Sequence, residues 1–336
     1  MQKRDPFFWQ RATLLAVAAA ASTFAIVWVQ PWTQLTGQPV ALSKTQPPQA
    51  KNSPASASSE VAAKGLKAQT LSKVIAQVQQ EAKVQLLSFS IPTEFQGKVL
   101  EDIPLEGKDK AIALTFDDGP SPPYTEEILD ILKKNNIKAT FFVIGQNLKA
   151  YPQLGQKIVA EGHVIANHTW SHSYRQFSPS GAAHEIDATA AMIYKVTGVQ
   201  PSIFRPPGGF LHNGVADYAK QQKYFVALWS ADANDWKRPS PEVLANNVLR
   251  ESKSGGMALM HDGGGERSHT VKALPTIIAE LKKRGYRFVT VPELLEMQDK
   301  EIKAKVAKSK ATAKTAQQNP TPSLNNKVEA KTQQSL

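Results

Sequence analysis

The stretch Ala111-Ile112-Ala113-Leu114-Thr115-Phe116-Asp117-Asp118-Gly119-Pro120 decides the fold of this chain. Its first six residues are mostly apolar and too tightly bounded for a helix, which predicts a buried strand. Two adjacent carboxylates follow, and Gly-Pro then predicts a turn. Like charges at the end of a buried strand are costly unless a cation holds them. Either Asp117 and Asp118 merely begin a turn, or one binds a metal and the other acts as a base.

Strand patterns alternate with helical patterns from this stretch to about residue 290. The later strands are expected near residues 139–145, 163–166, 203–205, 225–230, 257–260 and 287–290, and helices near 125–134, 183–196, 243–252 and 271–284. Such alternation predicts an α/β fold with a parallel sheet. About seven strands in ~190 residues, without a GxGxxG motif, favour a (β/α) barrel over a Rossmann sheet.

The basic charge of the chain lies on its ends. The 336 residues carry a net charge of +11. Residues 1–70 hold seven Lys/Arg against two Asp/Glu, and residues 298–336 hold eight against three, which leaves the centre nearly neutral. This distribution predicts tails that adhere to anionic membranes or wall polymers, and it argues against a specific nucleic-acid groove. The absence of cysteine excludes disulfides, thiolate zinc sites and a cysteine nucleophile.

The N-terminus has the pattern of a membrane-directing segment. Lys3, Arg4 and Arg11 precede 18 uncharged residues at 12–29. This length lies between a signal peptide and a spanning helix, and aromatic residues on both sides suggest interfacial belts. We expect residues 1–30 to be a cytoplasmic start with an uncleaved anchor, which places the remainder outside the cytoplasm. The alternative is a cleaved signal, with a secreted or periplasmic product.

Three further segments surround the predicted domain at residues 110–297. Residues 31–69 are rich in Pro, Ser, Ala and Gln and are expected to be a disordered linker. Residues 70–109 are expected to form a lead-in helix and an extended segment. Apolar periodicity stops after Glu296, so residues 298–336 are expected to be a disordered basic tail.

Polar clusters follow five different predicted strands. They are Asp117-Asp118, Asn167–His172, Arg205–Gly209, Ser230–Trp236 and Leu259–Asp262. In a parallel barrel the working residues lie just beyond the carboxyl ends of the strands. We therefore expect these clusters to meet at one end of the sheet.

One carboxylate and two histidines have the composition of a catalytic metal site. His168 and His172 are four residues apart, which on a helix would place both rings on one face. With Asp118 they make a set that leaves positions open for water and substrate. The ligand types favour zinc, and cobalt, nickel, manganese and iron also fit. His163 and His184 are expected to be structural or surface residues.

The order of these motifs resembles that of the polysaccharide deacetylase family, carbohydrate esterase family four. The motifs are Thr115–Pro120, His168–His172, Arg205–Gly208, Asp232–Trp236 and Leu259–His261. Each is weak alone, but all five in order are specific. The resemblance covers about residues 110–297. It implies a distorted (β/α) barrel and a polysaccharide deacetylase catalytic domain there.

The resemblance assigns one half of the chemistry to the metal and the base. Asp118, His168 and His172 would hold the divalent metal. Asp117 would take a proton from water, and Arg205 would keep that carboxylate ionised.

The other half concerns the leaving group and the pocket. By the same resemblance His261 would protonate the departing amine, and Asp232 would tune His261. Trp236 and Leu259 would wall the pocket for the acetyl methyl, and the backbone N–H of Gly208 would meet the oxyanion. Many family members carry an aromatic residue in place of Gly208, so this departure bears on substrate choice.

The expected function is metal-dependent N-deacetylation of an N-acetylated sugar polymer in the cell wall, with peptidoglycan favoured. An esterase or chitin deacetylase acting on another acetylated glycan is an alternative. A non-catalytic glycan-binding wall protein is an alternative of another class, and a mononuclear iron oxygenase with the same ligand types is a third. The expected partners are the glycan and, through the N-terminal helix, a membrane.

Overall fold

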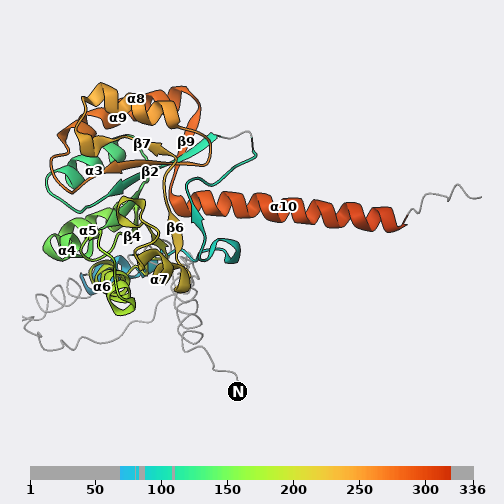
Figure 1. Ribbon diagram of the computed structural model, residues 1–336, viewed down its shortest axis with the longest axis horizontal. Helices are drawn as coiled ribbons and strands as arrows, with labels where there is room; N and C mark the ends of the chain where they lie inside the picture. The colour runs from blue at the N-terminus through green and yellow to red at the C-terminus, as the bar shows by residue number, and fades with distance from the viewer. Residues whose placement is uncertain (1–68, 80, 83–87, 108–109, 319–336) are drawn as a thin grey trace, which may run out of the picture. The chain divides into compact units, whose positions relative to one another are not determined.

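The computed structural model describes residues 69–79, 81–82, 88–107 and 110–318 (Figure 1). The predicted membrane segment and almost all of the predicted linker, residues 1–68, lie outside this part. Within the described residues, no helix combines the length and apolarity needed to cross a membrane. The expected anchor therefore stays a prediction.

Within the described part of the chain, the sheet has nine strands, and every ladder between them is parallel. The strands are β1 Val99–Leu100, β2 Lys110–Asp117, β3 Thr140–Val143, β4 Val164–Asn167, β5 Ile203–Phe204, β6 Phe225–Ala227, β7 Ala231–Asp232, β8 Gly256–His261 and β9 Tyr286–Val289. Their order is β1-β6-β5-β4-β3-β2-β8-β7, with β9 paired to the first half of β2. The result is a curled half-barrel with β1 and β7 at its edges, which confirms the predicted parallel (β/α) architecture. The two extra strands, β1 and β7, have only two residues each and are too short to be recognised by periodicity.

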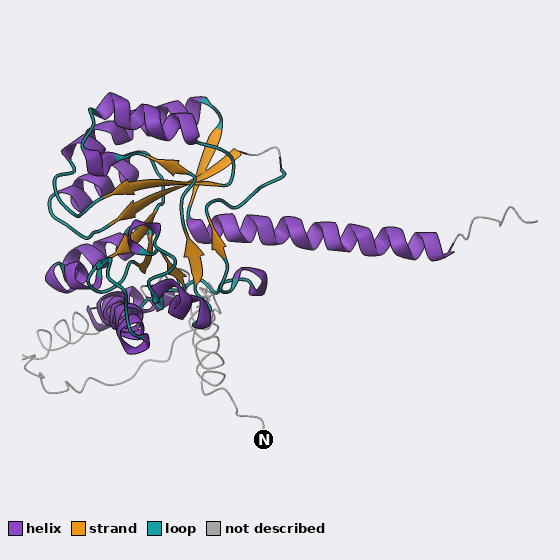
Figure 2. Cartoon of the chain, in the orientation of Figure 1, coloured by secondary structure: helices purple, strands orange, loops and turns teal. Residues whose placement is uncertain are grey.

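Helices lie outside the strands (Figure 2). Besides a helix at residues 69–79, they are α3 Tyr124–Lys134, α4 Gly145–Ala150, α5 Pro152–Ala160, α6 Pro179–Thr197, α7 Val215–Gln221, α8 Pro241–Glu251, α9 Ser268–Lys283 and α10 Val291–Gln318, with short 3-10 turns η1 Thr93–Phe95, η2 Pro207–Gly209 and η3 Asp235–Lys237. The N-termini of two helices follow directly from the sequence. Ser178 and Ser240 cap α6 and α8, and each serine is followed by proline at the first helical position.

Strand β2 pairs with β3, β8 and β9 and buries both of its faces. Leu114 and Phe116 belong to a cluster shared with Leu129 of α3. The alternate residues Ala111 and Ala113 belong to the second cluster, which fills the inner side of the curled sheet. A parallel strand that is covered on both faces has a nearly continuous apolar sequence. Burial of both faces therefore explains the apolar run from which the fold was predicted.

The prediction of a disordered tail is wrong for residues 298–318, which continue α10 to Gln318. Alanine and lysine are strong helix formers and need no apolar stripe. Lys303 pairs with Asp299 one turn earlier at 2.6 Å. The Glu301 carboxylate accepts the N–H groups of Glu106 and Gly107 at 2.9 and 3.1 Å. Residues 319–336 of the predicted tail lie outside the described part.

The predicted lead-in helix is present at residues 69–79. Its apolar side chains at helical spacing, Leu71, Val74, Ile75 and Val78, are 46–61% exposed. Helical spacing predicted this helix correctly, although its apolar face is not buried.

Candidate active site

The predicted clusters meet in one pocket of about 550 Å3 at the carboxyl ends of the strands. Nine of the ten predicted site residues line it: Asp117, Asp118, His168, His172, Gly208, Asp232, Trp236, Leu259 and His261. The tenth, Arg205, is fully buried and bonded to Asp117. Asp117 and His261 are register partners at the ends of β2 and β8, so two candidate proton-transfer groups face the same space.

Asp118, His168 and His172 are arranged as a candidate metal site, with one ligand atom from each within 4.8 Å of the others. The Nε2 atoms of His168 and His172 lie 3.4 and 3.1 Å from Asp118 Oδ1. Bonds of about 2.0–2.1 Å to a tetrahedral ion would separate its ligands by roughly 3.3 Å. Among the described residues, the buried Oδ1 has no hydrogen-bond partner. The donor set therefore fits a divalent cation.

The tautomer of His168 supports the same assignment. Its Nδ1 lies 2.7 Å from the carbonyl oxygen of Arg205. A carbonyl can only accept, so Nδ1 carries the proton and Nε2 is left as the ligand atom. Burial raises the pKa of Asp118, while the two imidazoles lower it, and the net pKa is well below its usual value. Asp118 is thus a carboxylate at neutral pH.

The two histidines do not lie on a helix, and the reason given for their pairing was wrong. They are part of a loop after β4, in which Thr169 and His172 adopt positive φ values of 68° and 55°. The Glu185 carboxylate of α6 accepts the N–H groups of residues 170 and 171, both at 2.9 Å. This loop brings the ring centroids within 5.0 Å. Sequence reasoning missed Glu185, because nothing local marks it as a loop anchor.

Arg205 holds Asp117 in a network that is almost wholly buried. Its guanidinium donates to Asp117 Oδ1 and Thr115 Oγ1, both at 2.8 Å. It also donates to the carbonyls of Ala227 and Leu228, and lies 4.1 Å from the ring centroid of Phe142. Burial lowers the pKa of Arg205, and Asp117 raises it. The predicted ion pair is present, and two further guanidinium N–H groups bond to backbone carbonyls of the barrel wall.

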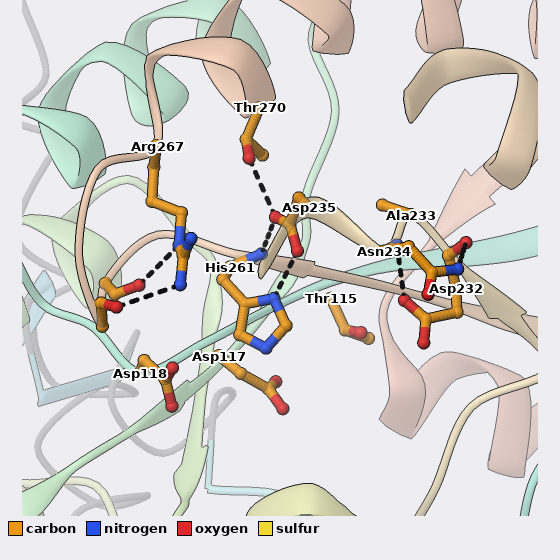
Figure 3. A network of polar contacts seen from close by, with 12 residues as sticks. Thr115, Asp117, Asp118, Asp232, Ala233, Asn234, Asp235, His261, Arg267 and Thr270 are labelled. Atoms are coloured by element: carbon orange, nitrogen blue, oxygen red, sulfur yellow. Dashed lines mark hydrogen bonds and ion pairs between the residues drawn. The ribbon is translucent and has the colours of Figure 1, made fainter. Parts of the chain in front are cut away.

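The residue that contacts His261 is Asp235, which corrects the expectation for Asp232. Asp235 Oδ1 accepts from His261 Nδ1 at 2.6 Å, and Oδ2 accepts from the His261 backbone and from Thr270 at 2.8 Å (Figure 3). Burial lowers the pKa of His261, but Asp235 and, to a smaller extent, Asp118 and Asp117 raise it more, to about 9. The imidazole is therefore charged at neutral pH, as a general acid requires.

Asp232 lines the pocket but is turned toward its own backbone. Its Oδ1 accepts the N–H of Asn234 at 2.7 Å, while its own N–H donates to Glu251. Asn234 has a positive φ of 52°, and this turn presents Asp235 to His261. Both carboxylates belong to one motif, and spacing alone does not distinguish them. Burial raises the pKa of Asp232.

A glycine loop after β8 packs against Asp118 and was not singled out from the sequence. A Cβ on Gly264 would lie 2.4 Å from Asp118 Oδ2, and one on Gly263 would lie 2.2 Å from the Asp118 carbonyl oxygen. Arg267 donates to the carbonyls of both glycines. The run of glycines at 263–265 was the available signal, because close backbone approach requires that residue type.

A two-histidine, one-carboxylate set beside a candidate base and acid defines a candidate metal-assisted hydrolase on a parallel half-barrel. The family model for polysaccharide deacetylase matches residues 105–227. A peptidoglycan-N-acetylglucosamine deacetylase of Bacillus cereus is 43% identical over 201 residues, which cover 59% of this chain and 93% of the relative. The chain belongs to the polysaccharide deacetylase family.

Two further matches agree with this assignment. The peptidoglycan-N-acetylmuramic acid deacetylase PdaC of Bacillus subtilis is 37% identical over 194 residues, covering 57% of this chain and 40% of that protein. The crystal structure of the Bc1960 peptidoglycan N-acetylglucosamine deacetylase superposes with a TM-score of 0.56 at 38% identity. That match covers 60% of this chain and 94% of the crystallised one.

Proposed function

We propose that this protein is a divalent-metal-dependent N-deacetylase that hydrolyses the acetamide of N-acetylated sugars in peptidoglycan. The observation that carries the proposal is the meeting of three elements in one pocket: the ligand set Asp118, His168 and His172, the Asp117–Arg205 pair and the His261–Asp235 pair. Together they supply what this route of amide hydrolysis uses: a polarised carbonyl, a base for the attacking water and an acid for the leaving amine.

When bound, a divalent cation supplies charge that polarises the acetamide carbonyl and makes a water molecule more acidic; zinc is the proposed ion. Asp117, oriented by Arg205, accepts the proton of the attacking water. The new C–O bond forms as charge develops on the carbonyl oxygen, and the N–H of Gly208 is the proposed donor to that oxygen.

The C–N bond then breaks as His261 gives its proton to the nitrogen. An amine is a poor leaving group until it is protonated, and Asp235 keeps the imidazole charged for this step. Acetate and a free amino sugar leave. The exposed Trp236 and the buried Leu259 line the same pocket and are the proposed walls for the acetyl methyl.

The polymer is inferred from the names of the relatives, which are deacetylases of N-acetylglucosamine or N-acetylmuramic acid in peptidoglycan. The predicted N-terminal anchor and the basic ends support a place at the wall, outside the cytoplasm. We propose N-acetylglucosamine units as the first substrate to test, since the relative that is 43% identical is named a peptidoglycan-N-acetylglucosamine deacetylase.

The test is acetate release by the purified protein from peptidoglycan, N-acetylglucosamine oligomers, chitin and acetylated xylan. We expect release from peptidoglycan, loss of that release with a chelator, and recovery with zinc. Asp117→Asn should abolish it while glycan binding persists. No release from any glycan with zinc or cobalt present would contradict the proposal. Binding without release by the unaltered protein would favour a non-catalytic wall protein.

A further inference from the structure

We propose that Tyr174 is the aromatic wall on which the sugar ring of the substrate packs, and that it takes the place of a side chain at position 208. This inference rests on the proposed function, since a pyranose ring is the ligand that such a wall would take. Tyr174 is a specificity-determining residue in this proposal, separate from the groups that move protons.

The space above position 208 is already filled by the Tyr174 ring. A Cβ built on Gly208 would lie 2.9 Å from Tyr174 Cε1, a separation that real Cβ contacts essentially never show, and 3.3 Å from Phe210. Gly208 also has a φ of +59°, which side chains rarely adopt. The absence of a side chain at Gly208 therefore leaves the space that the Tyr174 ring occupies.

The ring of Tyr174 is held by two other rings. It meets His172 edge to face at 5.2 Å and 85° between planes, and Phe210 at 5.4 Å and 76°. Such T-shaped pairs are the favoured aromatic geometry. The ring is fixed from these sides and yet 55% exposed. A rigid and half-exposed aromatic side chain loses little conformational entropy when a ligand packs on it.

The Tyr174 ring lies where it could contact a ligand in the pocket. Tyr174 lines the pocket that also holds the ligand set and Trp236, whose side chain is 57% exposed. Two exposed aromatic rings in one polar pocket match a ligand with apolar C–H faces and a polar rim, which describes a pyranose. Phe210, 51% exposed, packs against Tyr174 and does not itself line the pocket.

The kinetic test compares Tyr174→Ala, Tyr174→Phe and the control Tyr194→Ala on an N-acetylglucosamine oligomer. Tyr194, on α6, is also 55% exposed. For Tyr174→Ala we expect KM to rise about tenfold with kcat changed less than about threefold, because a contact made equally in ground and transition states affects KM. Tyr174→Phe keeps the ring and should restore a KM near the unaltered value. Tyr194→Ala should change neither constant.

The possible failures are distinguishable. An active unaltered protein with the same KM after Tyr174→Ala would overturn this inference alone. Weaker zinc binding by Tyr174→Ala would also overturn it, since the ring would then act by supporting His172. An unaltered protein that releases no acetate would overturn the proposed function, and the inference with it.

A stability cycle tests the complementarity without any substrate. Gly208→Ala should lower the melting temperature more when it is made in the unaltered protein than when it is made in the Tyr174→Ala variant. In that variant the new methyl no longer clashes with the Tyr174 ring, and only the strain of the positive φ at position 208 remains. Equal decreases in both backgrounds would show that Tyr174 does not occupy the space at position 208.

Discussion

Asp235 accepts the Nδ1–H of His261 at 2.6 Å with one carboxylate oxygen and the hydroxyl of Thr270 with the other. These bonds orient the imidazole and leave its Nε2 as the atom that can deliver a proton to the pocket. Against the effect of burial, the same carboxylate is the largest contribution that raises the pKa of His261, which reaches about 9 with smaller contributions from Asp118 and Asp117. If His261 is the acid of the proposed reaction, we expect this pair of residues from η3 and β8 to set its alkaline limit.

Replacement of Asp235 by Asn should move the alkaline limb of the pH profile. The negative charge that favours the imidazolium is lost, so the pKa of His261 falls and the acid is deprotonated at lower pH. We expect the limb of kcat/KM to move down by about 1–3 pH units. Asp232→Asn is the matched control, because Asp232 makes no hydrogen bond to His261 among the described contacts, and its shift should be smaller. A larger shift in Asp232→Asn than in Asp235→Asn would instead support the original assignment, in which Asp232 tunes His261.

Removal of a single ligand should weaken metal binding. For His172→Ala we expect zinc affinity to fall by more than about 100-fold, beyond the effect typical of residues that only support a ligand. Competition with a chelating indicator measures the affinity directly. His184→Ala is the control, since His184 is exposed on α6 and contacts Trp170. Equal affinities in the two variants would rule out the proposed ligand set.

Gly264→Ala should reduce metal affinity through sterics alone. The new methyl would lie 2.4 Å from Asp118 Oδ2 and would displace that carboxylate. Gly285→Ala is a close control, because Gly285 also has a positive φ, of 81°, but no atom of the described residues lies within 4 Å of its Cβ position. Both variants should lose about 1 kcal/mol of stability to backbone strain. Only Gly264→Ala should lower zinc affinity, and a similar loss in Gly285→Ala would refute the steric explanation.

Replacement of Arg205 by Met should be strongly destabilising. The change leaves Asp117 buried without its cation, which costs about 3–5 kcal/mol of unfolding free energy. Urea denaturation measures this difference. Adding Asp117→Asn to the same chain removes the uncompensated charge and should recover part of the stability. No recovery in the double variant would mean that Arg205 acts mainly through its bonds to Ala227 and Leu228.

Asp262 should make the stability of the fold depend on pH between about 4 and 7. This carboxyl is fully buried beside Thr125, and burial raises its pKa to about 7. The native state then keeps a proton that the unfolded chain releases near 4. Native protein binds more protons in this interval, so the free energy of unfolding falls as pH rises. Asp262→Asn should flatten that part of the curve, measured by urea denaturation at pH 5 and 7. An unchanged slope would contradict this account.

Local sequence determined a large part of this molecule. Residues 111–117 form a strand buried on both faces because apolar side chains alternate toward two cores. A continuous apolar run is typical of such a strand in a parallel sheet. The alternation of strands and helices after this strand implied a parallel sheet, and in such a sheet the functional polar residues lie beyond the carboxyl ends of the strands. Nine of ten predicted site residues line the pocket for this reason.

Tertiary structure decided which of these residues touch. The loop after β4, anchored by Glu185, pairs His168 with His172, although their spacing suggested a helix. A left-handed Asn234 selects Asp235 over Asp232. Tyr174 occupies the space left by Gly208, which lies on a different strand end. Sequence patterns report which face or strand end a residue shares, whereas contacts across the pocket depend on loop dihedrals and on side chains brought from distant positions in the chain.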